Sequence, residues 1–185
     1  MLSIGWIHTI AAVAAMVTGA AVLVTRKGTR RHRQVGWAYV ASMLLLNLTA
    51  LLIYRLFGGF GPFHVAAVFS LATVLAGTIA ALRARKARRS RNAAARAKAL
   101  EHHYQWMTWS YVGLMAAAVS EVATRVPALQ PAPGQGVVFG ITVAVATLIV
   151  VGVGGHLIRG RRVPLLGPYQ PPADQMTYPS PSRRP

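Results

Sequence analysis

The chain has 185 residues and a mean hydropathy of +0.44, with 54% hydrophobic and only 12% charged residues. Soluble domains carry about 25% charged residues, so this composition excludes an ordinary soluble protein and is typical of an integral membrane protein. The absence of cysteine excludes disulfides, thiolate metal sites and covalent C-x-x-C-H haem attachment.

Five apolar stretches are each long enough to cross a bilayer as a helix, which takes about 20 residues. They cover residues 2–24, 36–57, 62–82, 106–126 and 137–158. We therefore predict an all-α membrane bundle of five transmembrane helices within residues 1–162. The prolines that follow, from Pro164 to Pro185, oppose helix and core formation, and they predict a disordered tail over residues 163–185.

The net charge of +17 would suggest nucleic acid in a soluble domain. Here, however, 18 of the 20 lysines and arginines lie outside the apolar stretches, in residues 25–35, in residues 83–105 and after residue 158. By the positive-inside rule these segments are cytoplasmic, so the N-terminus lies outside and the C-terminus inside. We expect them to contact the anionic headgroups of the lipid bilayer, and no nucleic acid. Residues 83–100 contain neither proline nor glycine, so they extend a neighbouring helix or form an interfacial one.

Ionisable residues within the apolar stretches indicate a functional site. A carboxylate there costs about 2.5–3.5 kcal/mol on insertion scales, so Glu121 should face protein or water and have a partner. Arg125 follows it at i+4, on the same helix face, and can pair with it. Several polar residues lie near the predicted outer face, and we expect them to line one pocket there. They are His8, His64, Glu121, Arg125 and Arg55, with Asn47 as the floor of the pocket. The alternative is an interfacial ion pair, with both histidines bonded to nearby backbone or headgroups.

The other four histidines, His32, His102, His103 and His156, lie near the predicted inner face. On a helix the adjacent His102 and His103 point about 100° apart, so only one of them can easily share a site with His32 or His156. These residues are either candidate metal or haem ligands or solvated side chains in a basic segment.

The histidines favour several kinds of chemistry. Imidazole is the common ligand of haem iron and also binds Zn, Cu and Fe. Histidines near both faces favour b-type haem and electron transfer to a redox or membrane-protein partner. Alternatively, His8, His64 and Glu121 form a two-His, one-carboxylate metal set, or Glu121 and Arg125 clamp a ligand in a small transporter or sensor. A structural subunit without chemistry is the remaining alternative. The sequence has no P-loop, G-x-S-x-G or H-E-x-x-H motif.

Three runs of the sequence resemble the bacterial family of predicted membrane proteins known as DUF2306. These runs are KGTRRHRQVGWAYV (27–40), LLNLTALLIYRLFGGFGPFHVAAV (45–68) and EHHYQWMTWSYVGLMAAAVSEVATRVP (101–127). The residues that match this family's pattern are His32, Gly36, Asn47, His64, one of His102 and His103, Glu121 and Arg125. The resemblance covers most of the chain from the first to the fourth apolar stretch. It implies a multi-pass protein of the bacterial cytoplasmic membrane, without implying a particular activity.

Overall fold

The computed structural model describes residues 4–53, 59–125, 134 and 136–169, apart from the side chains of Pro62, Thr124 and Arg125. Over these residues all regular structure is helical, which confirms the predicted all-α class. The elements are α1 (Ile4–Val24), α2 (Arg30–Leu51), α3 (Pro62–Arg89), α4 (Ala93–Arg125), α5 (Gly136–Leu166) and the short 3-10 helix η2 (Gly167–Tyr169).

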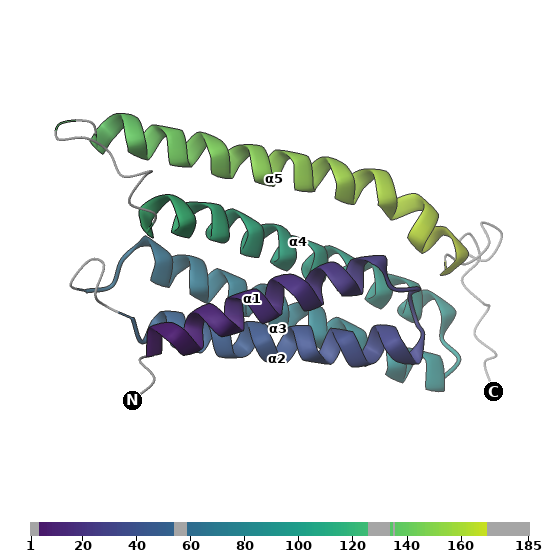
Figure 1. Ribbon diagram of the computed structural model, residues 1–185. Helices are drawn as coiled ribbons and strands as arrows, with labels where there is room; N and C mark the ends of the chain where they lie inside the picture. The colour runs from purple at the N-terminus through teal and green to yellow at the C-terminus, as the bar shows by residue number, and fades with distance from the viewer. Residues whose placement is uncertain (1–3, 54–58, 126–133, 135, 170–185) are drawn as a thin grey trace, which may run out of the picture.

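Helices α1 to α4 form a closed ring, in which α1 packs on α2, α2 on α3, α3 on α4 and α4 again on α1. Helix α5 lies outside this ring and, among the described elements, contacts only α4 and η2 (Figure 1). The ring surrounds one apolar core, made of Ala11, Ala15, Tyr39, Val40, Met43, Leu46, Val74 and Leu114. Ala11, Ala15 and Gly19 recur every four residues on the buried face of α1, and their small size lets the neighbouring helices approach closely.

Four helices, α1, α2, α3 and α5, are long and apolar enough to cross a membrane. Helix α4 has 33 residues, about 50 Å of helix, but it is not among these four candidate spans, although we predicted one at residues 106–126. Its position explains the difference, because α1, α3 and α5 all pack against it. Thr108 and Ser110 of α4 are buried, and the Ser110 oxygen lies 2.8 Å from the Tyr39 hydroxyl of α2, so these hydroxyls do not face lipid.

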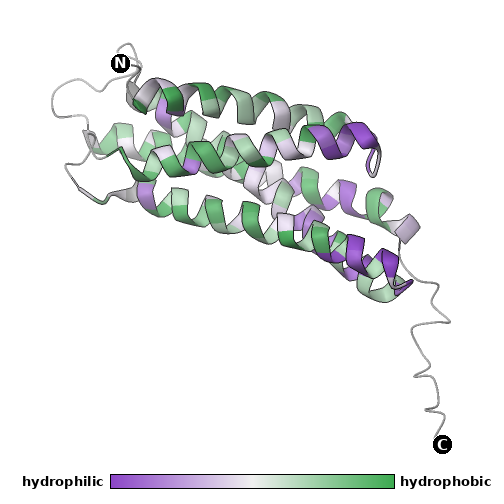
Figure 2. Cartoon of the chain, turned by 90° about the horizontal axis from the view of Figure 1, so that it is seen from below, coloured by the Kyte–Doolittle hydropathy of each residue, from purple (hydrophilic) through white to green (hydrophobic). Residues whose placement is uncertain are grey.

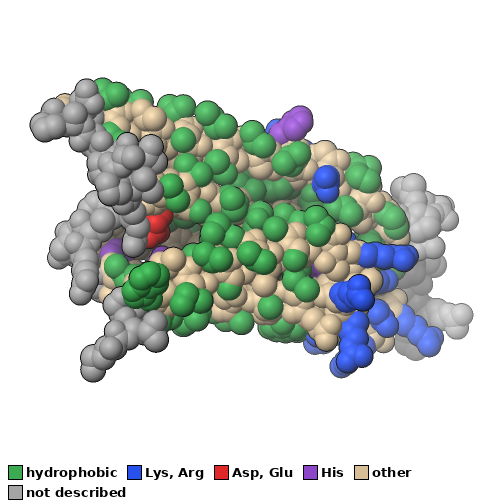
Figure 3. All heavy atoms as spheres, in the orientation of Figure 1, with side chains coloured by type: hydrophobic (Ala, Val, Ile, Leu, Met, Phe, Trp, Pro, Cys, Tyr) green, Lys and Arg blue, Asp and Glu red, His purple; other side chains and the backbone are tan. Residues whose placement is uncertain are grey.

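The charges of the described residues are segregated along the bundle. Lysine and arginine gather where α1, α3 and α5 end and where α2 and α4 begin, which we call the basic end (Figures 2 and 3). Glu121 lies toward the opposite end, which we call the Glu121 end. The predicted sorting of basic residues to one end is therefore confirmed for the part of the chain that the structure describes.

The first basic segment, residues 25–35, is more helical than predicted. Helix α2 begins at Arg30 rather than at residue 36, because the Thr29 hydroxyl accepts the His32 backbone N–H at 3.1 Å and caps the helix. Gly28 completes the preceding turn with a positive φ of 78°, which glycine adopts without strain.

Residues 83–105 are almost entirely helix, which confirms the expectation that residues 83–100 extend a neighbouring helix. Helices α3 and α4 continue toward each other until a short turn at residues 90–92, where Arg91 adopts a φ of 55°. The Asn92 side chain accepts the Ala95 N–H at 2.8 Å and caps α4. Four alanines of this hairpin are buried: Ala84 and Ala87 on α3, and Ala97 and Ala99 on α4. The arginines and lysines project from its surface.

Helix α5 also continues beyond its predicted end at residue 158. It runs through Pro164 to Leu166, and η2 follows, so residues 163–169 are helical although we predicted a disordered tail from residue 163. Tertiary contacts explain this difference, because Leu166 is buried and the Tyr169 ring lies 5.2 Å from the Arg96 guanidinium. The rest of the predicted tail lies outside the described residues.

Candidate functional site

His8 of α1 is held by a hydrogen bond to α2. Its side chain is buried, and its Nδ1 lies 3.1 Å from the Thr49 hydroxyl oxygen. Thr49 has a single hydroxyl proton, which it donates to the backbone carbonyls of Leu45 and Leu46 at 2.8 and 2.9 Å. Because this proton is engaged with the carbonyls, we assign to His8 the tautomer in which Nδ1 carries a proton and donates to the Thr49 oxygen.

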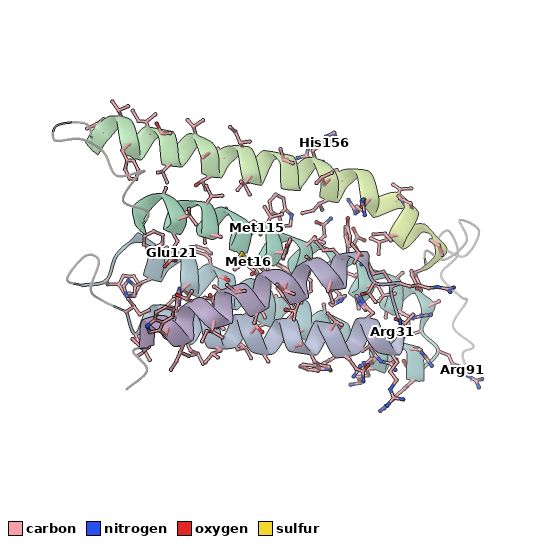
Figure 4. The ribbon with its side chains drawn as sticks, in the orientation of Figure 1. Met16, Arg31, Arg91, Met115, Glu121 and His156 are labelled. Carbon is pink, nitrogen blue, oxygen red and sulfur yellow. The ribbon has the colours of Figure 1, made fainter. Side chains whose placement is uncertain are left out.

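This hydrogen bond turns the other ring nitrogen of His8 toward α4. His8 Nε2 lies 3.7 Å from Oε2 of Glu121, whose side chain is 33% exposed against 10% for His8. Figure 4 shows Glu121 on α4, away from the basic end. The predicted convergence of an imidazole and the carboxylate, from separate helices, is thus present in the structure.

His64 bonds to nearby backbone, which is the alternative that the sequence left open for it. It is buried at the start of α3, where its Nδ1 accepts the Gly61 backbone N–H at 3.1 Å. Its ring stacks on Phe60 at a centroid distance of 5.0 Å. Because Nδ1 accepts a hydrogen bond, the ring in its neutral form carries its proton on Nε2. His64 therefore acts as a helix cap.

Of the three other residues of the predicted outer pocket, the structure describes the side chain of Asn47 alone. Asn47 is buried and donates from Nδ2 to the Met43 carbonyl of its own helix at 2.7 Å. Arg55 and the Arg125 side chain lie outside the described residues, so the predicted Glu121–Arg125 clamp stays a prediction.

The four inner histidines divide by their surroundings. His103 of α4 donates from Nδ1 to the Gly77 carbonyl of α3 at 2.9 Å, and its neighbours include His32 of α2. His102 and His156 are exposed, and Figure 4 shows His156 projecting from α5 away from the ring. Of the predicted inner ligands, the structure therefore brings together His32 and His103.

The predicted metal set of His8, His64 and Glu121 is not assembled. Among the described residues no three His, Asp or Glu side chains lie close enough together to hold a metal ion. His8 and Glu121 form a pair. This pair can hold a proton between an imidazole nitrogen and a carboxylate oxygen.

Sequence analysis missed Thr49, which fixes the orientation of His8. The sequence pointed to Thr49 only through a hydroxyl side chain two positions after Asn47 in the second apolar stretch. A threonine inside a helix often bonds only carbonyls of its own helix, so its position alone did not indicate a contact with His8. Sequence analysis also missed Lys27, the only lysine in the first basic connection, whose side chain donates to the Val22 and Leu23 carbonyls at 2.8 and 2.7 Å.

The helices and the segregated charges define a multi-pass helical membrane protein that carries an imidazole–carboxylate pair between α1 and α4. The family of predicted membrane proteins known as DUF2306 matches residues 5–158, and the chain belongs to this family. No curated protein and no solved structure matches the chain.

Proposed function

We propose that this protein takes up and releases a proton at the His8–Glu121 pair, in the proton-coupled movement or sensing of a small ligand. The observation that carries this proposal is the orientation of His8. Its Nδ1 proton is committed to Thr49, so Nε2 faces the carboxylate at 3.7 Å. Two groups that can each bind a proton thus face each other, and ionisable groups at such positions in a membrane protein mark proton relays.

The pair has two states that differ by one proton. With the proton present, the imidazolium faces the carboxylate, or the neutral imidazole faces the carboxylic acid. Without it, a carboxylate faces a bare nitrogen lone pair, which is unfavourable when both are partly buried. Release of the proton therefore changes the contact between α1 and α4. In the orientation that the positive-inside rule predicts, the pair is reached from outside the cytoplasmic membrane.

Infrared difference spectroscopy across a pH change tests this proposal, because a carboxylic acid C=O stretch is separate from the carboxylate bands. We expect a carboxylic acid signal that disappears in Glu121→Gln. In His8→Gln the same signal should appear at a different pH, because the carboxyl group has lost the partner with which it shares the proton.

Glu101→Gln serves as the matched control, since Glu101 lies on the same helix but pairs with Arg162 at the basic end. This variant should leave the Glu121 signal unchanged. A Glu121 signal that is identical in wild type and His8→Gln would contradict the proposal, because it would mean that the two groups do not share a proton.

The second candidate is a transition metal or a b-type haem iron bound by His8 Nε2. It is favoured by the Thr49 bond, because an imidazole that ligates a metal commonly donates its other N–H to a neighbouring group. On this candidate, protein purified from haem-replete cells should contain metal, and any Soret absorption should be lost in His8→Ala and kept in His156→Ala. Colourless, metal-free protein would contradict it and leave the proton proposal standing.

A further inference from the structure

The side chain of Glu121 is partly exposed, and the residues around it show what it is exposed to. The hydrogen bond between Ser120 of α4 and Thr147 of α5, at 3.1 Å, fixes which part of α5 lies beside Glu121. At this level the exposed side chains of the two flanking helices are apolar: Ile7 and Ile10 on α1, and Val145, Leu148 and Ile149 on α5. In a membrane protein such a belt contacts hydrocarbon. Glu121 therefore lies at the depth of the lipid tails.

An opening between α1 and α5 leads to this carboxylate. Both helices pack on α4 but do not contact each other, so part of α4 is left uncovered between them. Ser120 faces α5 and Glu121 faces α1, while Val122, about 100° further round α4, is 54% exposed. Figure 3 shows an acidic side chain in a recess between α5 and α1, where Figure 4 labels Glu121. The pair is therefore open sideways, toward the bilayer.

Two half-buried methionines lie deeper in the molecule along the same seam. Figure 4 shows Met16 on α1 and Met115 on α4 between the two helices, with Glu121 nearer to its own end of the bundle. Tyr111 of α4 donates to the Met16 carbonyl at 3.4 Å, which joins α1 and α4 at this point. Methionine side chains are flexible and polarisable, so they adapt to apolar molecules of different shapes. The seam can therefore receive the apolar part of a ligand whose polar part reaches Glu121.

The charge of the His8–Glu121 pair decides what that polar part is. With its proton the pair has no net charge. Without the proton it carries one negative charge, at a depth where a carboxylate is unfavourable. A bound cation neutralises this charge as the proton does, so the proton and the cation compete for one site. A neutral molecule or an anion gains no such advantage.

The titratable groups at the Glu121 end are few. Among the described residues α1 contributes His8, α3 contributes His64 as its cap, and α2 and α5 contribute none there. On α4 the other charged residue is Arg125, whose side chain lies outside the described residues. Of the residues that the structure describes at this end, Glu121 is therefore the acid that a cation can approach.

We propose that the ligand exchanged for the proton is a lipophilic organic cation, which reaches Glu121 sideways from the bilayer between α1 and α5. Its charge lies against the carboxylate, and its apolar part lies along Met16 and Met115. As the cation arrives, one proton leaves the pair, so the net charge of the occupied site stays the same. This inference rests on the proposed proton site and adds the chemical class of its ligand.

Binding of tetraphenylphosphonium to the protein in phosphatidylcholine nanodiscs tests this inference, with empty discs as the blank. Competition with one proton predicts saturable binding that becomes about tenfold tighter for each pH unit, over the range in which the pair still holds its proton. Tetraphenylborate has the same shape and the opposite charge, and it should show no saturable binding. Equal binding of the two ions overturns the inference, because charge would then not select the ligand.

Glu121→Gln should weaken tetraphenylphosphonium binding by about tenfold or more, since contacts with a charged group are individually worth at least that factor. The pH dependence should disappear with it. Glu101→Gln is the matched control, because this acid of α4 is bonded to Arg162 at the basic end, and it should bind the cation as the wild type does. Unchanged binding in Glu121→Gln would show that the cation lies elsewhere.

Val122→Trp tests the route, because it places a large side chain in the opening at a position that is already exposed. It should lose most of the cation binding and keep the infrared signal of Glu121. Ile10→Trp is the matched control, since Ile10 is 60% exposed, two residues from His8 and on the opposite side of α1. This control should bind the cation normally, and equal losses in both variants contradict the proposed route.

The ligand class and the proton site fail separately. An infrared signal of Glu121 that depends on His8, together with no saturable binding of tetraphenylphosphonium, overturns the ligand class and leaves the proton site standing. If Glu121 and His8 do not share a proton, the proton site is overturned and this inference falls with it.

Discussion

Replacing Tyr39 with alanine should lower the free energy of unfolding by about 3–5 kcal/mol, the range for removing a large buried aromatic side chain. Tyr39 is only 1% exposed and lies in the core of the four-helix ring. Its ring packs against Tyr111 at a centroid distance of 6.4 Å, and a methyl group added at Gly19 would lie 2.9 Å from it. So tight a site has little freedom to collapse into the cavity that alanine would leave.

The Tyr39 hydroxyl accounts for a smaller part of this effect. It lies 2.8 Å from the Ser110 oxygen, and Ser110 donates its own proton to the Met107 carbonyl at 2.9 Å. Tyr39 is therefore the donor in a buried bond between α2 and α4. Tyr39→Phe keeps the ring and removes only this bond, so it should cost about 1 kcal/mol.

Reversible unfolding in mixed detergents measures these differences. Trp37→Ala is the matched control, because Trp37 is an aromatic residue on the same helix but is 49% exposed. Its replacement should cost much less than that of Tyr39. Equal losses at the two positions would mean that the ring of helices does not enclose Tyr39 as described.

A double-mutant cycle between His8 and Glu121 should give a coupling free energy of about 1–3 kcal/mol, the upper part of the range for contacting residues. His8 has 10% side-chain exposure and Glu121 has 33%, so the pair is partly buried and its attraction is screened less than at a surface. The variants are His8→Gln, Glu121→Gln and the double change. The cycle isolates this pair from the other contacts that each residue makes.

Glu101 and Arg162 supply the comparison for this cycle. They also form an ion pair between α4 and α5, but the Arg162 side chain is 49% exposed at the basic end. Their coupling should be about 0.2–1 kcal/mol, as for other exposed pairs. If the His8–Glu121 coupling is no larger than this, the pair is an incidental contact and the proposed proton site loses its physical basis.

Much of the architecture was predictable because it depends on patterns local to the sequence. The lengths of the apolar stretches predicted all five helices, and the arginines of the connections predicted which helix ends lie together. The boundaries were less predictable. Thr29 capping starts α2 at Arg30 rather than at residue 36, and the structure decided between the two helical alternatives for residues 83–100. The continuation of α5 through Pro164 likewise depends on contacts of Leu166 and Tyr169 with other parts of the chain.

The candidate site was predicted only in part. Glu121 stood out as an acid in an apolar stretch, and His8 as a histidine at similar depth. The tautomer of His8, however, depends on the direction of the Thr49 hydroxyl, and the role of His64 depends on the start of α3 at Pro62. These are relations between particular atoms, and a pattern of residue types does not contain them.

The sequence by itself determined that this is a membrane protein, how many helices it has and at which end its positive charge gathers. Hydropathy and charge are properties of each residue wherever it lies, so these features follow from the sequence alone. Only the tertiary structure decided which polar residues meet. His8 and Glu121 are more than a hundred positions apart, and only the packing of α4 against α1 brings them together.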